Sequence, residues 1–396
     1  MTYHPLSFEI FKRFFPEGRR LDSLFRQVFK ENRVNPKEKR IIYYEVTGFI
    51  RLFPAWMAVN EPGKPIDEAE WTTILKAIKD FDWEAHAEKL INLPNKTKIT
   101  PALLSEFALP VLFRSWIGES VPDPLVLNFL KKSVMTRPVY LREIQDQVQV
   151  DPDLEPVYGI PGAWKLNNPI LDFADDWFQS GQFEIQDLSG QLASLMVNPK
   201  PNDKVMDACA GHGGKTIALA GLMKGKGKIV TIHVSDADIQ TLKLRARKHG
   251  IGNISPMKLD SPALDALKGT MDIVWVDAPC TGSGVIRRNP EVIYRLSETV
   301  IKKMEEEQLI LLNHYSQYVK PGGKLVYSTC SVFQNENEAV IQDFKTEHKD
   351  EMSLGSFAPG LNYYHLALPD INPIRLGFAD EPDSDGFFLS VLTKKK

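Results

Sequence analysis

The first third of the chain repeats its apolar residues at the spacing of amphipathic helices. One such set falls at positions i, i+3, i+4, i+7 and i+8, on a single helix face: Leu21, Leu24, Phe25, Val28 and Phe29. Prolines lie between the apolar segments, where they can begin or end helices, at Pro62, Pro94, Pro101 and Pro122. The pattern predicts an all-helical domain over residues 1–130.

Residues 131–190 change to a mixed pattern. The stretch RPVYLREI predicts a strand, and a polar stretch that contains proline and glycine follows, DPDLEPVYGIPGAW. We expect a small α/β segment that links two larger domains.

From residue 191 to 396, β-branched apolar runs alternate with helical stretches. Four runs have the composition of buried parallel strands: KVMDAC, KIVTIHV, MDIVWVDAPC and KLVYSTC. Helices are predicted between them, over GKTIALAGLMK, DIQTLKLRARKHG and residues 298–318. This alternation predicts a doubly wound, Rossmann-like α/β sheet. The last run, DGFFLSVLTKKK, predicts a strand at the edge of the sheet.

Composition is that of an ordinary globular protein. Of the 396 residues, 43% are apolar and 25% are charged. No apolar run reaches the roughly 18 residues of a membrane span, and the start, MTYHPLSFEIFKRFF, does not resemble a signal peptide. We therefore expect a cytoplasmic protein with no membrane partner.

The formal net charge of −3 gives no overall signal for nucleic acid, but basic residues are unevenly distributed. Residues 1–51 hold eleven Lys or Arg against six Asp or Glu. This stretch is either a solvated helical surface or a face that binds phosphates. On the second interpretation, the candidates for contact with the phosphates of a nucleic acid are Arg19, Arg20, Lys39 and Arg40.

A glycine-rich turn, DACAGHGGKT at residues 207–216, follows the first strand of the predicted sheet. In an open α/β sheet, ligands bind beyond the carboxyl ends of the strands, where glycines let the backbone approach and a helix start offers N–H groups. A P-loop would need glycine in place of Cys209, and the dinucleotide pattern fails because position 216 is Thr216. The turn stays compatible with S-adenosylmethionine, and a purely structural turn is the alternative.

Two cysteines follow neighbouring predicted strands. Cys280 comes after MDIVWVDAP, which contains Asp277, and Cys330 comes after KLVYST. Because adjacent parallel strands bring their carboxyl ends together, we expect these three residues to face one cleft near the turn. With Cys209, the chain has three widely spaced cysteines, which favours neither a disulfide framework nor a zinc site, and we expect no metal.

Two thiols and an acid fit the chemistry of methylation at carbon 5 of cytosine. That carbon becomes nucleophilic when a thiolate adds to carbon 6 while an acid engages N3. A base must then remove the carbon 5 proton so that the thiolate can leave. The site must also favour the thiolate form of the attacking cysteine.

At these motifs the chain resembles the Sun/Fmu family of RNA cytosine-5 methyltransferases. The matching motifs occur in order: GQFEIQDLSGQL, DACAGHGGKT, VDAPCTGSG, RRNPE, STCSVFQNENE and DGFF. The resemblance implies a class I methyltransferase sheet, S-adenosylmethionine as cofactor and RNA as partner. The stretch NPKEKRIIYYEVTGFIR resembles the NusB-like RNA-binding domain of bacterial members that modify small-subunit ribosomal RNA. Ribosomal RNA is therefore favoured over transfer RNA, and a monomer is expected.

The resemblance also implies residue roles. Cys330 would be the nucleophile, Cys280 would help to release the product, and Asp277 would hold the base at N3. Arg288, within RRNPE, would support the active-site loop or contact the RNA. Contacts to the cofactor would come from the turn and from neighbouring strand ends: Asp207, Cys209, Ala210, Gly211, Gly213, Gly214, Lys215, His233, Asp260 and Asp277.

One position departs from the family pattern, and two other functions compete. His233 stands where an acid normally binds the ribose hydroxyls, and a neutral histidine cannot clamp both; Asp236 or Asp238 could substitute. A DNA cytosine-5 methyltransferase would use Cys280 as its nucleophile and would not need Cys330. A non-catalytic RNA-binding scaffold would explain His233 but not the intact cysteines.

Overall fold

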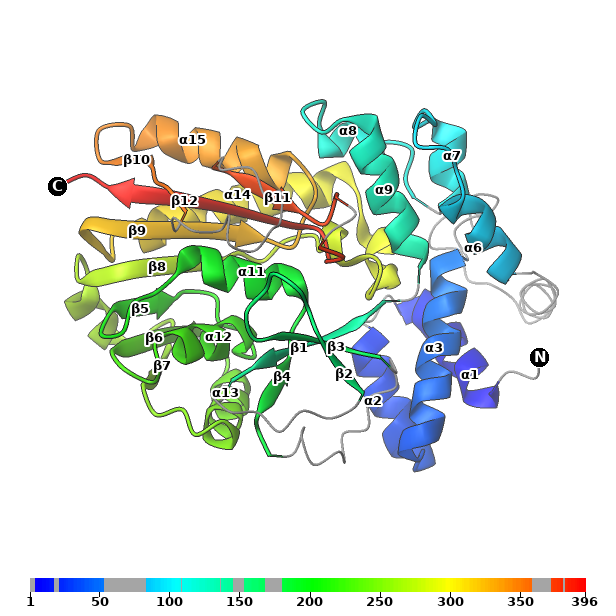
Figure 1. Ribbon diagram of the computed structural model, residues 1–396, viewed down its shortest axis with the longest axis horizontal. Helices are drawn as coiled ribbons and strands as arrows, with labels where there is room; N and C mark the ends of the chain where they lie inside the picture. Colours follow the sequence, from blue (N-terminus) through cyan, green and yellow to red (C-terminus); the bar gives the residue numbers. More distant parts are fainter. Residues whose placement is uncertain are drawn as a thin grey trace. The chain divides into compact units, whose positions relative to one another are not determined.

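The structure, a computed structural model, describes residues 4–17, 21–52, 83–107, 109–135, 137–144, 153–167, 180–357, 372–379 and 382–396. The chain forms two compact units. The helical unit comprises Met1–Thr136 and Val285–Leu296, and the sheet unit comprises Arg137–Gly284 and Ser297–Lys396. Figure 1 labels the elements of both units.

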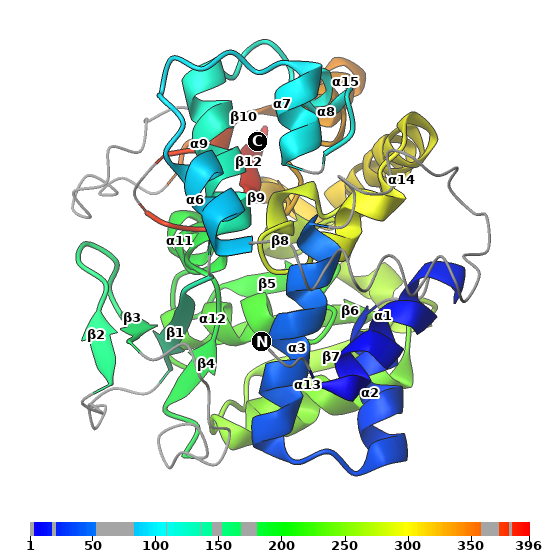
Figure 2. The same cartoon turned by 90° about the vertical axis from the view of Figure 1, so that its right-hand side faces the viewer.

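The helical unit confirms the helices expected in the first third of the chain (Figure 2). They are α1 (Pro5–Glu17), α2 (Leu21–Asn32), α3 (Pro36–Leu52), α6 (Trp83–Ile91), α7 (Pro101–Glu106), α8 (Phe113–Ile117) and α9 (Asp123–Val134). On α2 the predicted apolar face is buried, with Leu24 and Val28 fully inaccessible. Pro101 begins α7 and Pro122 precedes α9, while Pro62 lies outside the described residues.

A second segment, Val285–Leu296, belongs to the helical unit although it is distant in sequence. The Tyr294 hydroxyl donates a hydrogen bond to the Ile50 carbonyl oxygen at 2.8 Å. The Tyr294 ring meets Phe14 edge-on, with centroids 5.7 Å apart. This segment contains the RRNPE motif, and its position between a strand and a helix of the sheet unit did not indicate these contacts. The domain boundaries at residues 130 and 190 stay a prediction.

The sheet unit begins with a small antiparallel sheet in the order β2-β3-β1-β4. Its strands are β1 (Val139–Glu143), β2 (Leu154–Pro156), β3 (Ala163–Leu166) and β4 (Phe183–Ile185). The strand expected over RPVYLREI is confirmed as β1. One apolar cluster joins all four strands, through residues that include Leu141, Leu154 and Phe183. Helix α11 (Leu188–Val197) leads from β4 to the large sheet.

The large sheet has the order β10-β12-β9-β8-β5-β6-β7, with β11 paired to β12 (Figure 1). The strands are β5 (Lys204–Asp207), β6 (Lys228–His233), β7 (Ile254–Lys258), β8 (Met271–Asp277), β9 (Val319–Thr329), β10 (Met352–Leu354), β11 (Ile374–Leu376) and β12 (Phe387–Lys394). The helices are α12 (Gly214–Leu222), α13 (Asp236–Lys248), α14 (Glu298–Ser316) and α15 (Val340–Glu347). Strands β5 to β9 are parallel, which confirms the Rossmann-like α/β sheet.

Alternate strand residues bury against helices on opposite faces of this sheet. Val205 and Ile273 belong to a core cluster with α11 and α12. Their neighbours Met206 and Val274 belong to the cluster that contains residues of α14 and α15. Because both faces are covered, the parallel strands carry continuous apolar runs, as the sequence predicted.

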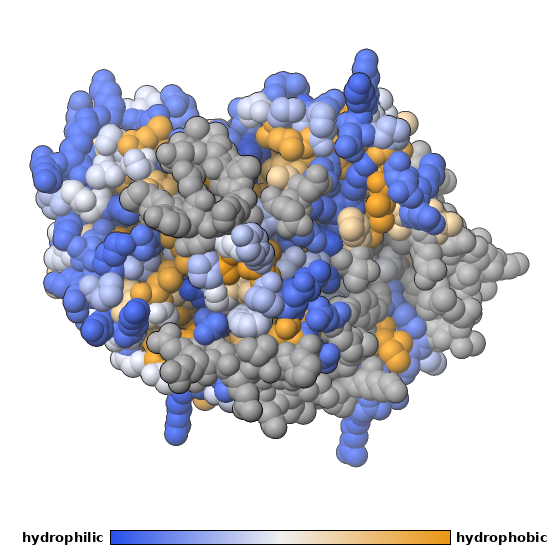
Figure 3. Space-filling view, in the orientation of Figure 1, coloured by the Kyte–Doolittle hydropathy of each residue, from blue (hydrophilic) through white to orange (hydrophobic). Residues whose placement is uncertain are grey.

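The prediction that the last run is an edge strand is wrong. β12 pairs with β9 on one side and with β10 and β11 on the other. Phe388 and Leu389 are fully buried on alternate faces of the sheet, because flanking strands and helices cover both. In Figure 3, the described residues on the face shown are mostly hydrophilic, with apolar ones in small separate areas. Within the described ranges, no helix is both long and apolar enough to cross a bilayer.

Candidate active site

The carboxyl ends of the parallel strands bring the predicted residues to one edge of the sheet. Asp207 at the end of β5 aligns with Trp275 on β8 and Thr231 on β6. Asp277 at the end of β8 aligns with Ser328 on β9. From β5 the chain adds β6 and β7 on one side of the sheet and then β8 and β9 on the other. The gap between β5 and β8 in the chain order is the topological switch point, where open α/β sheets bind ligands.

The two cysteines are in direct contact. Cys280 Sγ and Cys330 Sγ lie 3.2 Å apart, a hydrogen-bond distance for sulfur. The hydrogen bond with Cys330 and burial together raise the pKa of Cys280 well above its usual range. Cys280 therefore stays a thiol and can donate its proton toward Cys330. This confirms that the two strand ends face one site.

Asp277 is held by residues from two other segments. The Lys215 ammonium donates to Asp277 Oδ2 at 2.7 Å, and the Ser328 hydroxyl donates to Oδ1 at 2.7 Å. Burial would lower the pKa of Lys215, but the charge and hydrogen bond of Asp277 raise it, and a thiolate at Cys330 would add to this. Lys215 Nζ also lies over the Phe387 ring, 5.1 Å from its centroid. A fixed cation therefore stands near both the acid and the nucleophile candidate.

The glycine-rich turn has the backbone geometry that its sequence requires. Gly211 and Gly213 have φ of +48° and +85°, in the left-handed region that favours glycine. Gly213 immediately precedes α12, so the first N–H groups of that helix begin here. A Cβ atom at Gly213 would lie 2.2 Å from Leu242 Cδ1, which makes this glycine necessary for packing as well. Gly214 is half-buried beside it.

Other turn residues face inward. The Asp207 carboxyl is 2% exposed and accepts a hydrogen bond from the Thr216 hydroxyl at 2.6 Å. Burial raises the pKa of Asp207 to about 6. Burial and the nearby carboxylates of Asp207 and Asp277 raise the pKa of Cys209, so this thiol stays protonated. Ala210 is half-buried.

His233 is 3% exposed at the end of β6. Its Nε2 lies 2.8 Å from the Thr231 hydroxyl oxygen, its Nδ1 is buried, and the backbone of Gly211 also interacts with the ring. Burial lowers the pKa of His233, which favours the neutral ring. Asp236 forms an ion pair with Lys258, and Asp260 is exposed just beyond β7. Asp238, which like Asp236 could substitute for the acid absent at position 233, accepts a hydrogen bond from the Ser235 hydroxyl at the start of α13.

Sequence reasoning missed a partly buried ionic cluster next to the turn. Arg245 on α13 donates to Glu184 Oε1 at 2.8 Å and also to the carbonyl oxygen of His212. His249 Nε2 lies 2.5 Å from Glu184 Oε2, and its Nδ1 lies 2.6 Å from the Gly181 carbonyl oxygen. Although burial acts in the other direction, the hydrogen bond from His249 and the charge of Arg245 lower the pKa of Glu184. Glu184 and Gly181 lie within GQFEIQDLSGQL and His212 lies within DACAGHGGKT, but Arg245 and His249 belong to none of the matching motifs.

The basic candidates are only partly described. Arg19 and Arg20 lie outside the described residues, and Arg40 lies on α3. Lys39 on α3 is exposed, with its ammonium 5.7 Å from the centroid of Phe29. Arg288 is half-buried in Val285–Leu296, the second segment of the helical unit.

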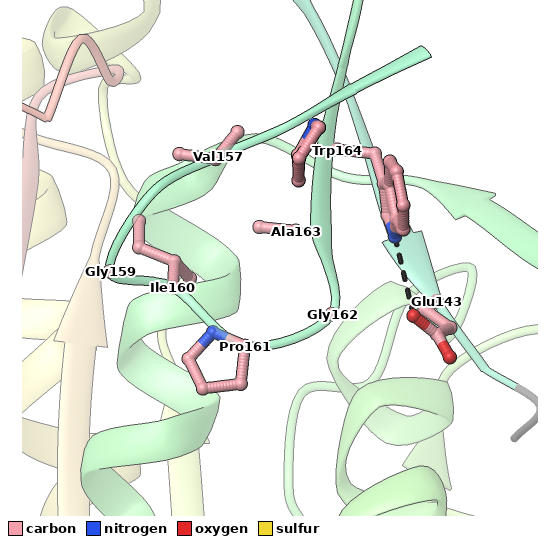
Figure 4. Close-up of a pocket in the computed structure, with 9 residues that line it drawn as sticks. Glu143, Val157, Gly159, Ile160, Pro161, Gly162, Ala163 and Trp164 are labelled. Carbon is pink, nitrogen blue, oxygen red and sulfur yellow. Dashed lines mark hydrogen bonds between the residues drawn. The ribbon is translucent and has the colours of Figure 1, made fainter. Parts of the chain in front are cut away.

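A hollow of about 370 Å³ opens elsewhere, on the small sheet (Figure 4). The β2–β3 hairpin lines it together with Glu143, which accepts a hydrogen bond from the Trp164 indole at 3.3 Å. None of the predicted site residues lines this hollow. Among the described residues, no cluster of His, Cys, Asp and Glu could hold a metal ion.

Comparison with known proteins identifies the family. The sequence profile described as 16S rRNA methyltransferase RsmB/F matches residues 194–393, about half of the chain. The chain belongs to this family, which confirms the resemblance to Sun/Fmu proteins.

Two named relatives illustrate the match. The probable ribosomal RNA small subunit methyltransferase B of Bacillus subtilis is 34% identical over 226 residues, 55% of this chain and 49% of the relative. That of Coxiella burnetii is 28% identical over 386 residues, 90% of this chain and 85% of the relative. The chain thus spans about half the length of the first relative.

Solved structures support the fold. The crystal structure of PH0851 matches 98% of this chain and 89% of its own, with a TM-score of 0.68 and 24% identity. A methyltransferase homologue from Pyrococcus horikoshii matches 79% of this chain and 99% of its own, with a TM-score of 0.57 and 22% identity. Both similarities concern the fold alone.

Proposed function

We propose that this protein is an S-adenosylmethionine-dependent RNA cytosine-5 methyltransferase that acts on small-subunit ribosomal RNA through a covalent bond between Cys330 and carbon 6 of the target cytosine. The observation that carries the proposal is the contact between Cys280 and Cys330, with 3.2 Å between their Sγ atoms, beside a carboxylate. Family membership supports the reaction and the ribosomal substrate. Transfer RNA is the alternative substrate. A monomer in the cytoplasm is part of the same proposal.

The protonation of the two thiols supports Cys330 as the nucleophile. The pKa of Cys280 is raised by its hydrogen bond with Cys330 and by burial, so Cys280 remains a proton donor. Its hydrogen bond and the nearby Lys215 cation favour a thiolate at Cys330. The Cys330 thiolate attacks carbon 6, forms the C–S bond and makes carbon 5 nucleophilic. The DNA-type mechanism would need the thiolate at Cys280, which its surroundings disfavour.

In this mechanism, Asp277 contacts the edge of the cytosine that carries N3 and the amino group at carbon 4. As a carboxylate it accepts hydrogen bonds only, so it receives one from that amino group. When the thiolate adds, negative charge develops at N3. The proton shared in the Lys215–Asp277 hydrogen bond can move to N3 and neutralise that charge.

The residues of the turn fit S-adenosylmethionine, which supplies the methyl group when bound. The glycine backbone at Gly211 and Gly213 and the start of α12 suit its amino-acid end. A neutral ring at His233 can form one hydrogen bond with the ribose, and Asp260 lies beyond the adjoining strand end.

Release of the product needs loss of the carbon 5 proton. Cys280 lies close enough to Cys330 to assist the base that removes it. The electron pair of that C–H bond then re-forms the double bond between carbons 5 and 6, and Cys330 leaves as a thiolate.

Transfer of a radiolabelled methyl group from S-adenosylmethionine to purified small-subunit ribosomal RNA tests the proposal, with transfer RNA as the comparison. We expect wild-type protein to label ribosomal RNA, and Cys330→Ala to bind it without labelling it. A folded wild-type protein that labels neither RNA would contradict the enzymatic function. Label on transfer RNA alone would change the substrate.

A further inference from the structure

The segment after Cys330 contains a buried acid that the reaction above does not use. Residues Asn335–Ala339, NENEA, form a π-helix, a rare conformation that often marks functional sites. Glu336 within it is completely buried. A buried carboxylate is unfavourable unless hydrogen bonds compensate for the lost water, so its partners indicate what it is for.

The Glu336 carboxylate joins the loops of the two cysteines. Its Oε2 accepts hydrogen bonds from the Thr281 N–H at 2.8 Å and from the Gln308 amide at 3.0 Å. Its Oε1 accepts from the Thr281 and Ser331 hydroxyls, each at 2.5 Å. Thr281 directly follows Cys280, and Ser331 directly follows Cys330. One side chain therefore connects the residues next to both thiols.

Further hydrogen bonds fix the same two loops. The Gln308 amide on α14 also donates to the Pro279 carbonyl oxygen at 2.8 Å, so Cys280 is held from both sides. On the other loop, the Asn337 amide donates to the Ser331 carbonyl oxygen at 3.0 Å, and the Thr329 hydroxyl donates to Asn337 Oδ1 at 2.6 Å. The π-helix thus holds the residues on either side of Cys330.

The four groups that contact the Glu336 carboxylate can all donate, which suits an ionised carboxylate, since that group only accepts. Burial raises the pKa of Glu336 above its usual value, and the hydrogen bonds from Ser331, Thr281 and Gln308 act in the opposite direction. A methionine at this position would keep most of the volume but make none of these bonds, whereas a glutamine could keep them, because the Thr281 and Ser331 hydroxyls can also accept from its NH₂ group. With methionine, the thiols would have no common anchor, and their separation would no longer be fixed.

We propose that Glu336 is a positioning residue that sets the contact between the Cys280 and Cys330 thiols by clamping their two loops. The inference rests on the proposed function for its effect on catalysis, but not for its effect on the thiols. Glu336 touches neither substrate nor cofactor. Its loss should lower kcat and leave the KM for RNA nearly unchanged, because docking of the RNA does not depend on the separation of the sulfur atoms.

The separation of the thiols can be measured without RNA or cofactor. Diamide oxidises two adjacent thiols to a disulfide, taking up their two electrons and two protons, and mass spectrometry follows the Cys280–Cys330 product. Wild-type protein should form it rapidly. We expect Glu336→Met to form it at least tenfold more slowly, with kcat reduced at least tenfold and KM within about twofold.

A control variant separates this effect from the loss of a carboxylate as such. Glu347→Met also removes a carboxylate that bonds to α14, through the Asn313 amide at 2.7 Å, but Glu347 is exposed and lies outside both cysteine loops. It should leave oxidation rate and kcat unchanged. If Glu336→Met does not fold, Thr281→Val removes one hydroxyl bond and keeps the backbone bond, and should slow both processes by about threefold.

The outcomes are distinguishable. A folded Glu336→Met variant with wild-type oxidation rate and kcat would overturn the proposal, as would an equal loss in the Glu347→Met control. Slower oxidation in a protein whose wild type methylates no RNA would support the clamp and refute the proposed function. Slower oxidation together with reduced kcat supports both.

Discussion

The buried carboxyl of Asp207 allows a quantitative test of how the glycine-rich turn affects the stability of the protein. Its carboxyl is 2% exposed, and burial raises its pKa from 3.8 to about 6. The difference of about 2 pKa units corresponds to about 3 kcal/mol by which the folded state disfavours the ionised form. Asp207→Asn removes this charge but keeps an oxygen that can accept the hydrogen bond from Thr216.

The sign of the pH dependence follows from the raised pKa. Below pH 3.8 the carboxyl is neutral in both folded and unfolded chains and imposes no penalty. As pH rises through the interval up to about 6, the unfolded chain releases the proton first, so the free energy of unfolding falls. At pH 7 the full penalty applies. We therefore expect Asp207→Asn to be more stable than wild type by up to about 3 kcal/mol at pH 7 and by only about 0.5 kcal/mol near pH 4.

Urea unfolding at both pH values measures this difference. The exposed Asp343 on α15 provides the control, since Asp343→Asn should change stability by less than about 0.5 kcal/mol at either pH. The reasoning is refuted if Asp207→Asn is no more stable than wild type at pH 7, or if its advantage is the same at pH 4.

A natural protein keeps such an unfavourable charge where function requires it. S-adenosylmethionine carries a positive sulfonium, whereas its demethylated product does not. Calorimetry on Asp207→Asn should therefore show a larger loss of affinity for S-adenosylmethionine than for S-adenosylhomocysteine. Equal losses would mean that Asp207 shapes the turn and contributes no charge to the ligand.

Three further predictions concern other parts of the site. Cys280→Ala should accumulate a protein–RNA adduct that survives denaturing electrophoresis, and Cys330→Ala should form none; the reverse result would exchange the two roles. Arg245→Met breaks the link from Glu184 to the turn and should weaken cofactor binding about tenfold, or about 1.4 kcal/mol by calorimetry, with RNA affinity unchanged as the check. Lys39→Glu should weaken RNA binding and flatten its salt dependence by about one to two counterions; an unchanged slope would make α3 an ordinary solvated surface.

The parts that could be predicted from the sequence are those with a local signal. Apolar runs defined the parallel strands, because a sheet covered on both faces leaves no polar alternation. Residues directly after such strands had to meet at one edge, so Cys280, Cys330 and Asp277 were brought together correctly. The turn could be predicted because glycine adopts positive φ angles that few other residues adopt, and Gly211 and Gly213 both have such angles.

The parts that were missed depend on contacts between distant residues. Arg245 and His249 both bind Glu184 across more than sixty positions of sequence, and nothing near them distinguishes them from other residues of an amphipathic helix. Tyr294 lies 244 positions from its partner Ile50, so its membership of the helical unit had no local signature. The prediction of an edge strand for β12 relied on its being the last strand of the chain. Order along the chain does not determine order in the sheet, where β12 lies between β10 and β9.

The Lys-Thr pair at the start of α12 explains why this turn resembles the end of a P-loop without being one. In a P-loop, such a lysine and hydroxyl serve phosphate and magnesium. Here Thr216 binds the carboxylate that ends β5, and Lys215 binds the carboxylate that ends β8. Both polar groups are therefore engaged by acids of the protein itself, and a phosphate at this point would face the carboxylate of Asp277. The same pair fixes the two strand ends against one helix start, so the turn and the reacting residues share one rigid support.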